Sequence, residues 1–244
     1  MVDEEQRQQE LADALGSVRQ RIADACAAAR REPGTVTLIA VTKTYPAKDA
    51  VRLLALGVHE LGESRDQEAA AKAAETDALL TSAGNPARPH WHFVGQLQRR
   101  KSRSVAAYAS AVHSVDRVSL VTALADAVAQ RDRDPLDVFA QVSLDGDPAR
   151  GGVTPDHLHE LADAVVERAE LRLRGVMAVA PMQADPERAF AGLRELSARV
   201  TGWYPLANAI SAGMSGDLEA AVNHGATHVR VGTALLGRRA RVFG

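Results

Sequence analysis

One lysine follows a run of apolar and β-branched residues in the segment TLIAVTKTYP, residues 37–46. Lys43 is predicted to be the last residue of a strand, on the same face as Ile39 and Val41, because side chains alternate along a strand. At such a position a desolvated lysine could keep a neutral amine, which attacks a carbonyl carbon to form a Schiff base. The alternative is a solvated lysine at a strand end that has no chemical role.

Two glycine turns in the last third of the sequence could bind a phosphate group. The first lies in SAGMSGDLEAA, residues 211–221, where we expect a strand end, a turn and a helix that begins at Ser215. The second lies in HVRVGTALLG, residues 228–237, where we expect the strand to end at Gly232-Thr233. Such a turn presents unpaired backbone N–H groups and the positive end of a helix, which favours an anion.

One arginine stands two residues before the second turn. Arg230 lies between Val229 and Val231, so the alternation along a strand puts it on the same side as Gly232. If that side faces inward, the guanidinium would be a fixed cation near the turns, since arginine stays protonated in proteins. The alternative is an arginine in a surface salt bridge.

The elements that would position these residues alternate regularly between strands and helices. Strands are predicted at 37–43, 58–63, 90–95, 110–115, 137–144, 171–179, 206–213 and 227–232. Helices are predicted at 3–31, 47–56, 65–80, 97–108, 116–131, 154–169, 185–200 and 215–224. This pattern predicts an α/β fold, and eight units in 244 residues favour a single (β/α)8 TIM-like barrel over an open doubly wound sheet. Residues 1–244 would form one domain, with an extra N-terminal helix (1–34) packed on the barrel.

Composition argues against several classes of function. The net charge of −2 leaves no basic field for nucleic acid, and no apolar run approaches the ~20 residues of a membrane span. The acidic start MVDEEQRQQE is unlike a signal peptide, so we expect a cytoplasmic protein. With Cys26 as the only cysteine, neither a disulfide framework nor a cysteine metal site is expected. His90 and His92 share a face, but no third ligand accompanies them, so no metal site is predicted.

The candidate residues would meet at one end of the barrel. In barrels of this kind the active face lies at the C-terminal ends of the strands, and the loops after strands seven and eight often bind phosphate. Lys43, both glycine turns and Arg230 would lie at that face. A lysine, a phosphate cradle and a buried arginine together suggest pyridoxal 5′-phosphate, an aldehyde that carries a phosphate. A lysine Schiff-base aldolase without a cofactor could also use such turns, and it stays open at this point.

Seven motifs follow one another between residues 36 and 237: AVTKTYP, LGESRDQE, WHFVGQLQRRK, HSVDR, LRGVMAV, SAGMSGDLEAA and VRVGTALLG. Together they resemble the pyridoxal phosphate homeostasis protein family, whose fold is similar to the N-terminal barrel of alanine racemase. By this resemblance Lys43 forms the Schiff base with the cofactor, and Arg230 faces the pyridine nitrogen. The residues that match the segments around the phosphate are Ser211, Met214, Ser215, Gly232 and Thr233. The further residues that the resemblance implies near the cofactor are Val41, Ser64 and His92.

Ser64, Ala212 and the segment 149–153 depart from the family pattern, and the change at Ala212 should matter little. Ser64 stands where the family usually has asparagine, so an amide contact near the cofactor is missing or replaced by a hydroxyl. The glycine-rich ARGGV, residues 149–153, replaces a commoner Lys-Ser/Thr-Gly turn. The role of the Arg150-Gly151-Gly152 loop therefore stays open.

Two functions compete for a chain of this kind. The first is a non-catalytic monomer that holds pyridoxal phosphate and passes it to apo-enzymes, and the second is an amino-acid enzyme similar to a racemase. Racemase-like enzymes add a β-rich domain and use a tyrosine acid/base, whereas the barrel takes up this chain and none of Tyr45, Tyr108 and Tyr204 matches that role. Because arginine only donates hydrogen bonds, Arg230 would keep the ring nitrogen unprotonated and weaken the ring as an electron sink. The carrier function is favoured, and no catalytic residue is predicted.

Overall fold

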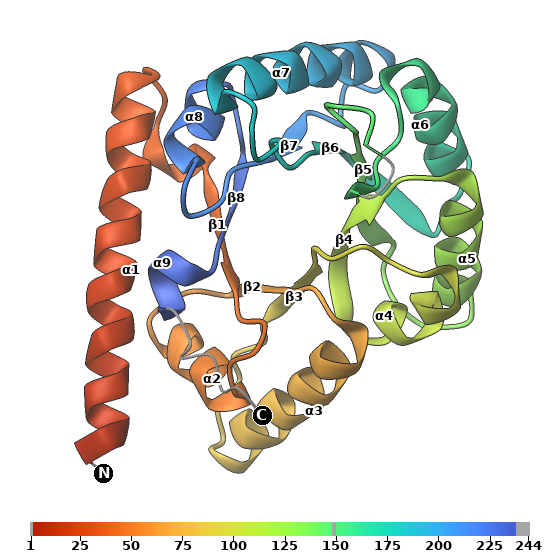
Figure 1. Ribbon diagram of the computed structural model, residues 1–244. Helices are drawn as coiled ribbons and strands as arrows, with labels where there is room; N and C mark the ends of the chain where they lie inside the picture. Colours follow the sequence, from red (N-terminus) through yellow and green to blue (C-terminus); the bar gives the residue numbers. More distant parts are fainter. Residues whose placement is uncertain (1, 148–149, 238–244) are drawn as a thin grey trace.

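The computed structural model of this protein describes residues 2–147 and 150–237. In it, eight parallel strands close into a barrel in the order β1 to β8. The strands are Thr37–Val41 (β1), Glu60–Glu63 (β2), His90–Phe93 (β3), Ala109–Val115 (β4), Leu136–Gln141 (β5), Leu171–Met177 (β6), Ala209–Ser211 (β7) and His228–Val231 (β8). β1 pairs with both β2 and β8, which closes the ring (Figure 1). The predicted (β/α)8 barrel is confirmed, and the open doubly wound sheet is wrong.

Helices surround this barrel on its outside (Figure 1). The α-helices are Val2–Ala28 (α1), Ala47–Ala55 (α2), Asp66–Ser82 (α3), Ser102–Tyr108 (α4), Val118–Ala129 (α5), Leu158–Val166 (α6), Pro186–Trp203 (α7), Leu218–Asn223 (α8) and Thr233–Leu236 (α9). Among the described residues, short 3-10 helices lie at Pro33–Thr35, Arg99–Lys101 and Pro155–His157. None of the helices within the described residues has the length and apolarity that crossing a bilayer would demand.

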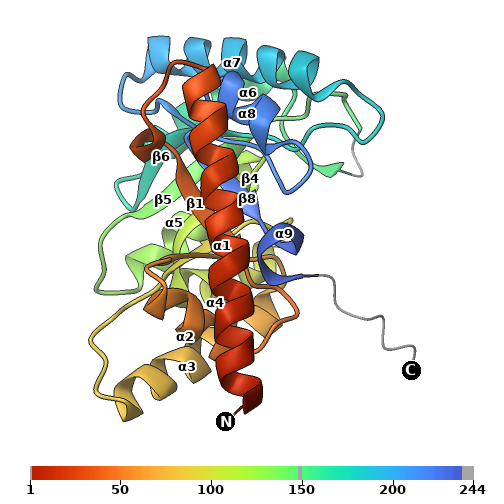
Figure 2. The same ribbon diagram turned by 90° about the vertical axis from the view of Figure 1, so that its left-hand side faces the viewer.

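The extra N-terminal helix is longer than its neighbours and lies along one flank of the barrel. Helix α1 packs against α8, α9 and α2, and it runs along the outside of the ring (Figures 1 and 2). Leu11, Leu15, Val18 and Ile22 are buried at helical spacing on its inner face. The predicted amphipathic helix is therefore present, and it covers the side of the barrel where β1 and β8 meet.

The first strand ends two residues before the position predicted for its end. β1 stops at Val41 because its partner register with β2 ends there, at Val41 and Gly62. Thr42 still donates its N–H to the Gly62 carbonyl oxygen at 2.9 Å, and the chain then turns at Thr44, whose φ is +69°. The prediction that Lys43 is the last residue of the strand is wrong: Lys43 lies in the turn that follows β1.

One glycine fixes how closely β6 and β7 approach. Gly175 has a φ of +148°, and a Cβ at this position would lie 1.9 Å from the carbonyl oxygen of Ala209. Only a residue without a side chain fits such an approach. The contact helps to fix the register of β7, in which Gly175 stands opposite Ala209 and Met177 opposite Ser211.

The inside of the barrel carries polar side chains where barrels of this kind usually pack branched aliphatic residues. His92, His113, Ser211 and Arg230 are buried, with exposed fractions of 6%, 0%, 0% and 5%. Buried polar groups are stable only when they are hydrogen-bonded. The strands must therefore align these polar side chains so that each finds a hydrogen-bond partner. Ser211 and Arg230 lie toward the C-terminal ends of β7 and β8.

Candidate functional site

The predicted site residues gather where β1, β7 and β8 end. β1 pairs with β8, with Ile39 opposite Arg230, and β7 pairs with β8 in turn. The backbone of Gly232 lies close to Val41, since a Cβ on that glycine would be 3.4 Å from the Val41 carbonyl oxygen. The lysine turn and the two glycine turns are therefore neighbours at one side of the barrel mouth.

Lys43 is exposed to solvent. The predicted desolvation of this lysine is wrong, because the chain leaves the barrel wall at Thr42 before it reaches Lys43. The backbone on each side of it is nevertheless fixed. The Thr42 N–H donates to Gly62 on one side, and the Thr44 N–H donates to the carboxylate of Glu68 on the other. The amine is thus accessible while its backbone is held in place.

A second lysine, which the sequence did not indicate, is hydrogen-bonded to the backbone of the turn that carries Lys43. Lys72 is 5% exposed, and its Nζ donates to the Thr42 carbonyl oxygen at 2.7 Å and to Glu63 Oε1 at 2.5 Å. The Thr42 hydroxyl donates to the same Glu63 oxygen at 2.7 Å. Burial raises the pKa of Glu63, and the contacts with Lys72 and Thr42 offset part of that rise. The ion pair therefore anchors the residue directly before Lys43.

The turn after β7 is built differently from the prediction. Helix α8 begins at Leu218, with Asp217 at its N-cap position, so the prediction that Ser215 opens the helix is wrong. The carboxylate of Asp217 accepts instead from the Met214 N–H at 2.6 Å and closes the turn. Gly213 has a φ of +90°, and a Cβ there would lie 2.7 Å from the Cβ of Ala221. A glycine is required at this bend.

Ser215 links the two glycine turns. Its Oγ accepts from the backbone N–H of Ala234 at 3.2 Å, in the first turn of α9. Gly232 and Thr233 form the beginning of that segment, with Gly232 half-buried and Thr233 exposed. The hydroxyl and the backbone amides of the second turn therefore face one another, and an anion bound there would meet donors from both turns.

Two arginines of α1 donate hydrogen bonds to the segments that follow β7 and β8. Arg21 donates to the Ser215 carbonyl oxygen at 3.0 Å and pairs with Glu219 at 2.7 Å. Arg7 donates to the Leu236 carbonyl oxygen at 3.2 Å and pairs with the buried Asp49 at 2.8 Å. The two arginines are 14 residues apart, about four helical turns, so they lie on one side of α1, where Arg21 reaches the turn after β7 and Arg7 reaches the C-terminal end of α9.

Arg230 points into the barrel, and the alternative of a surface salt bridge is wrong. Its Nη1 donates to Ser211 Oγ at 2.6 Å, and its Nη2 donates to the Ala178 carbonyl oxygen at 2.9 Å. Burial lowers the pKa of Arg230 to about 10, with Asp217 acting weakly in the opposite direction. The guanidinium is therefore still a cation at neutral pH, and it keeps N–H groups that neither acceptor uses.

His92 lies in the interior with two partners. One ring nitrogen is 2.6 Å from Glu60 Oε2, and the other is 2.8 Å from His113 Nε2. His113 in turn contacts Ser211 Oγ at 2.8 Å. The hydroxyl of Ser211 is therefore engaged with His113 and Arg230. His113 was missed from the sequence, although its place in the alternating segment SAVHSV could have indicated an inward side chain.

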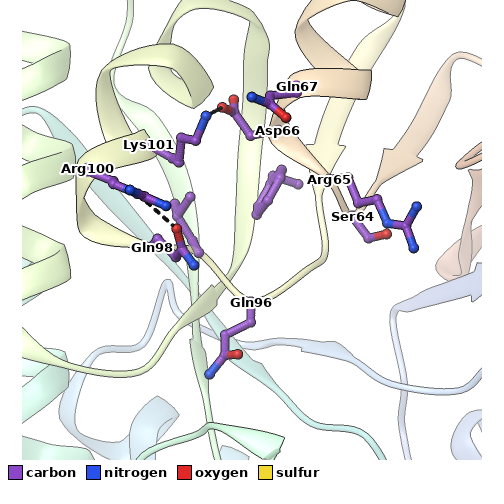
Figure 3. A pocket seen from close by; sticks show the side chains of 10 residues that line it. Ser64, Arg65, Asp66, Gln67, Gln96, Gln98, Arg100 and Lys101 are labelled. Carbon is purple, nitrogen blue, oxygen red and sulfur yellow. Dashed lines mark hydrogen bonds and ion pairs between the residues drawn. The ribbon is translucent and has the colours of Figure 1, made fainter.

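Ser64 directly follows β2, the strand beside β1, and it lines a pocket of about 610 Å³ (Figure 3). Charged and amide side chains surround this pocket, with Lys101 3.3 Å from Asp66 and Arg100 bonded to Gln98 at 3.1 Å. Ser64 itself is half-buried. In the barrel, β1 lies between Ser64 and the two glycine turns.

The glycine-rich loop after β5 has a clear structural role. A Cβ on Gly152 would lie 2.6 Å from the backbone nitrogen of Ser143, and Gly151 and Gly152 have φ values of +68° and +100°. Arg150 donates to the carbonyl oxygens of Val179 and Ala180 at 2.8 and 2.9 Å. The described part of the loop is therefore fastened to the segment after β6.

Comparison with known proteins places the chain in a family. The family model described as the alanine racemase N-terminal domain matches residues 15–240. A pyridoxal phosphate homeostasis protein of Mycobacterium bovis is 47% identical over 243 residues, which cover 96% of this chain and 94% of that protein. The structure of PipY from Synechococcus elongatus with pyridoxal phosphate bound has a TM-score of 0.78 and 33% identity, and the match covers 93% of this chain and all of that one.

A more distant likeness concerns the fold alone. The structure of alanine racemase from Corynebacterium glutamicum has a TM-score of 0.66 and 14% identity, and the match covers 93% of this chain but 60% of that one. The shared part is therefore the barrel. Taken with the identity over nearly the full length of its closer relatives, this establishes that the chain belongs to the pyridoxal phosphate homeostasis protein family.

Proposed function

We infer that this protein binds pyridoxal 5′-phosphate covalently through Lys43. The observation that carries this inference is the meeting of an accessible lysine, two glycine turns and a buried arginine at one side of the mouth. The Nζ of Lys43 would attack the aldehyde carbon, and the aldehyde oxygen would leave as water when the C=N bond forms. The cofactor bound to PipY, the related protein, supports the same choice.

The residues at the mouth fit such a cofactor. Gly213 is buried at a bend where a side chain would meet Ala221, and Gly232 is half-buried beside Val41, so both turns run close to the barrel wall. The phosphate would be held by the segments that contain Met214, Ser215, Gly232 and Thr233, with Ser211 behind them. The ring nitrogen would meet Arg230, and the remaining neighbours would be Val41, Ser64 and His92.

Carriage of the cofactor in intracellular homeostasis fits these residues better than catalysis. Arginine offers only donors, so Arg230 would leave the ring nitrogen unprotonated. Two of the three tyrosine hydroxyls donate to other groups, and the third is buried away from the mouth. The Tyr45 hydroxyl donates to Gly237, the Tyr204 hydroxyl donates to Asp163, and the Tyr108 hydroxyl is buried, so burial raises its pKa well above the usual range. We propose a cytoplasmic monomer that passes the cofactor to apo-enzymes.

Proton exchange at an amino acid distinguishes carriage from the alternative, a racemase-like enzyme. We expect negligible α-deuterium incorporation when the loaded protein is incubated with L- or D-alanine in deuterated water, while pyridoxal phosphate still passes to an apo-enzyme. A positioned acid/base is worth ~10²–10⁴-fold in rate, and no tyrosine of this chain serves as one. Exchange at rates typical of enzymes, on the order of 1–10³ per second, would show that the protein is a catalyst.

Removal of the Ser215 hydroxyl tests the phosphate position. Ser215→Ala should weaken the affinity for pyridoxal phosphate by about 0.5–1.5 kcal/mol, the net value of one hydrogen bond. The Ala234 N–H would also lose its acceptor, so the turn would loosen. Equilibrium titration followed by absorbance measures the effect, with exposed Ser17→Ala on the outer surface of α1 as the control. An unchanged dissociation constant would show that the phosphate binds elsewhere.

A further inference from the structure

Five side chains form an unbroken row of hydrogen bonds through the barrel interior. Arg230 Nη1 is 2.6 Å from Ser211 Oγ, which is 2.8 Å from His113 Nδ1. His113 Nε2 is 2.8 Å from His92 Nδ1, and His92 Nε2 is 2.6 Å from Glu60 Oε2. The row crosses from β8 through β7, β4 and β3 to β2. It ends at Glu60, the first residue of β2, and so at the opposite end of the barrel from the mouth.

The donors in this row must all point the same way. Arg230 can only donate, so Ser211 Oγ accepts from it. The hydrogen of the buried Ser211 hydroxyl then needs an acceptor, and His113 Nδ1 is the one in reach. His113 therefore carries its proton on Nε2 and donates to His92 Nδ1. His92 in turn donates from Nε2 to the carboxylate of Glu60, which accepts.

The charges at the two ends agree with this direction. Burial raises the pKa of Glu60, but hydrogen bonds from His92 and from His90 outweigh burial and hold it at about 2. Burial is the main cause that lowers the pKa of His113 well below 6.5, and the guanidinium of Arg230 acts in the same direction. The row therefore has a cation at one end, a carboxylate at the other and a neutral His113 between them.

We propose that Ser211, His113, His92 and Glu60 are positioning residues that hold Arg230 as a donor toward the barrel mouth. This rests on the proposed function, in which Arg230 meets the ring nitrogen of pyridoxal phosphate. The carboxylate at the far end sets the direction of every donor in the row, and Ser211 and Ala178 together fix the guanidinium plane. A side chain at the N-terminal ends of the strands would thus act on a group bound at their C-terminal ends.

The first test uses the cofactor-free protein and does not depend on cofactor binding. ¹⁵N-NMR of the histidine rings should show the proton of His113 on Nε2 and no proton on Nδ1 of either His113 or His92, since both follow from the direction of the donors. A proton on Nδ1 of either ring would overturn the proposal. In those states the Ser211 hydroxyl would have no acceptor.

The second test asks whether the row acts through the ring nitrogen. His113→Phe keeps a flat ring against Phe139, whose centroid is 4.3 Å from that of His113, and removes both nitrogens. It should weaken pyridoxal phosphate binding about tenfold. The same variant should bind the pyridoxal phosphate analogue that has carbon in place of the ring nitrogen within about twofold of the unmodified protein. The analogue accepts no hydrogen bond from Arg230, so the variant loses none.

The matched control is His90→Gln. His90 is exposed and contacts Glu60 Oε1 at 2.8 Å, but it lies outside the row, so both ligands should bind as they do to the unmodified protein. Equal losses for the two ligands in His113→Phe would reduce His113 to a packing role and overturn the proposal. If the unmodified protein forms no bond at Lys43, the proposed function fails, while the NMR result still decides the direction of the row.

Discussion

Borohydride reduction of the protein loaded with pyridoxal phosphate should fix one pyridoxyl group, on Lys43. The reagent reduces the C=N bond to a stable amine, and peptide mass mapping then identifies the lysine. Lys43→Ala should lose the covalent product completely, because the substitution removes the nucleophile. It should fold normally, since the Lys43 side chain is exposed and the turn is held by Thr42 and Glu68.

Lys48→Ala is the matched control for this experiment. Lys48 lies five residues further along the chain, is exposed, and pairs with Glu4 at 2.9 Å. Its loss should leave the label on Lys43 unchanged. A label on Lys48, Lys72 or Lys101 in the unmodified protein would contradict the site, because those amines lie on helices or in the 3-10 helix rather than in the turn after β1.

Replacement of the buried lysine should have the largest effect on stability. Lys72→Met leaves Glu63 without its cation, at side-chain exposures of 5% and 0% for the two partners. Removal of one partner of a buried pair typically costs about 3–5 kcal/mol, since the other charge stays buried. Urea denaturation at pH 8 should therefore show a loss of free energy of unfolding in this range. Lys48→Met, which breaks an exposed pair, should cost about 0–1 kcal/mol.

The loss should depend on pH. Burial already raises the pKa of Glu63, and the loss of Lys72 raises it further. The native carboxyl then keeps a proton at pH values where the unfolded carboxyl, with a pKa of about 4.3, has lost it. Since the native state binds more protons, stability falls as pH rises, so Lys72→Met should be closer to the unmodified protein at pH 5 than at pH 8. Glu63→Gln in the same chain should recover much of the loss, and no recovery would show that the charge is not the cause.

Local signals in the sequence were sufficient for the fold and for the proximity of Lys43 to the two glycine turns. Apolar runs that alternate with helical segments give the barrel, and glycine with small polar residues marks the turns after β7 and β8. The end of β1 was misplaced because it depends on where β2 stops pairing and on the bend at Thr44, which are properties of the folded chain. The same holds for the helix start after Ser215, where Asp217 takes over the turn.

The interior contacts were beyond sequence reasoning for a different reason. From the sequence, Lys72 is predicted to be an ordinary exposed residue of an alanine-rich helix. Its ion pair with Glu63 forms only when α3 packs beside β1 and β2. His113 and Glu60 are far apart in the sequence and are joined through His92. Pairings of this kind depend on the closure of the barrel, which aligns strands that the sequence separates.

Helix α1 has a thermodynamic consequence for the mouth of the barrel. Arg21 and Arg7 bond to the carbonyl oxygens of Ser215 and Leu236, so docking of the helix and the shape of both turns are one coupled equilibrium. Such coupling is reciprocal. If docking of α1 raises the affinity of the turns for a ligand by some factor, binding of that ligand raises the equilibrium constant for docking by the same factor. If the turns hold the cofactor as proposed, the position of α1 would depend on occupancy of the mouth, and a partner that draws α1 away would favour release of the cofactor.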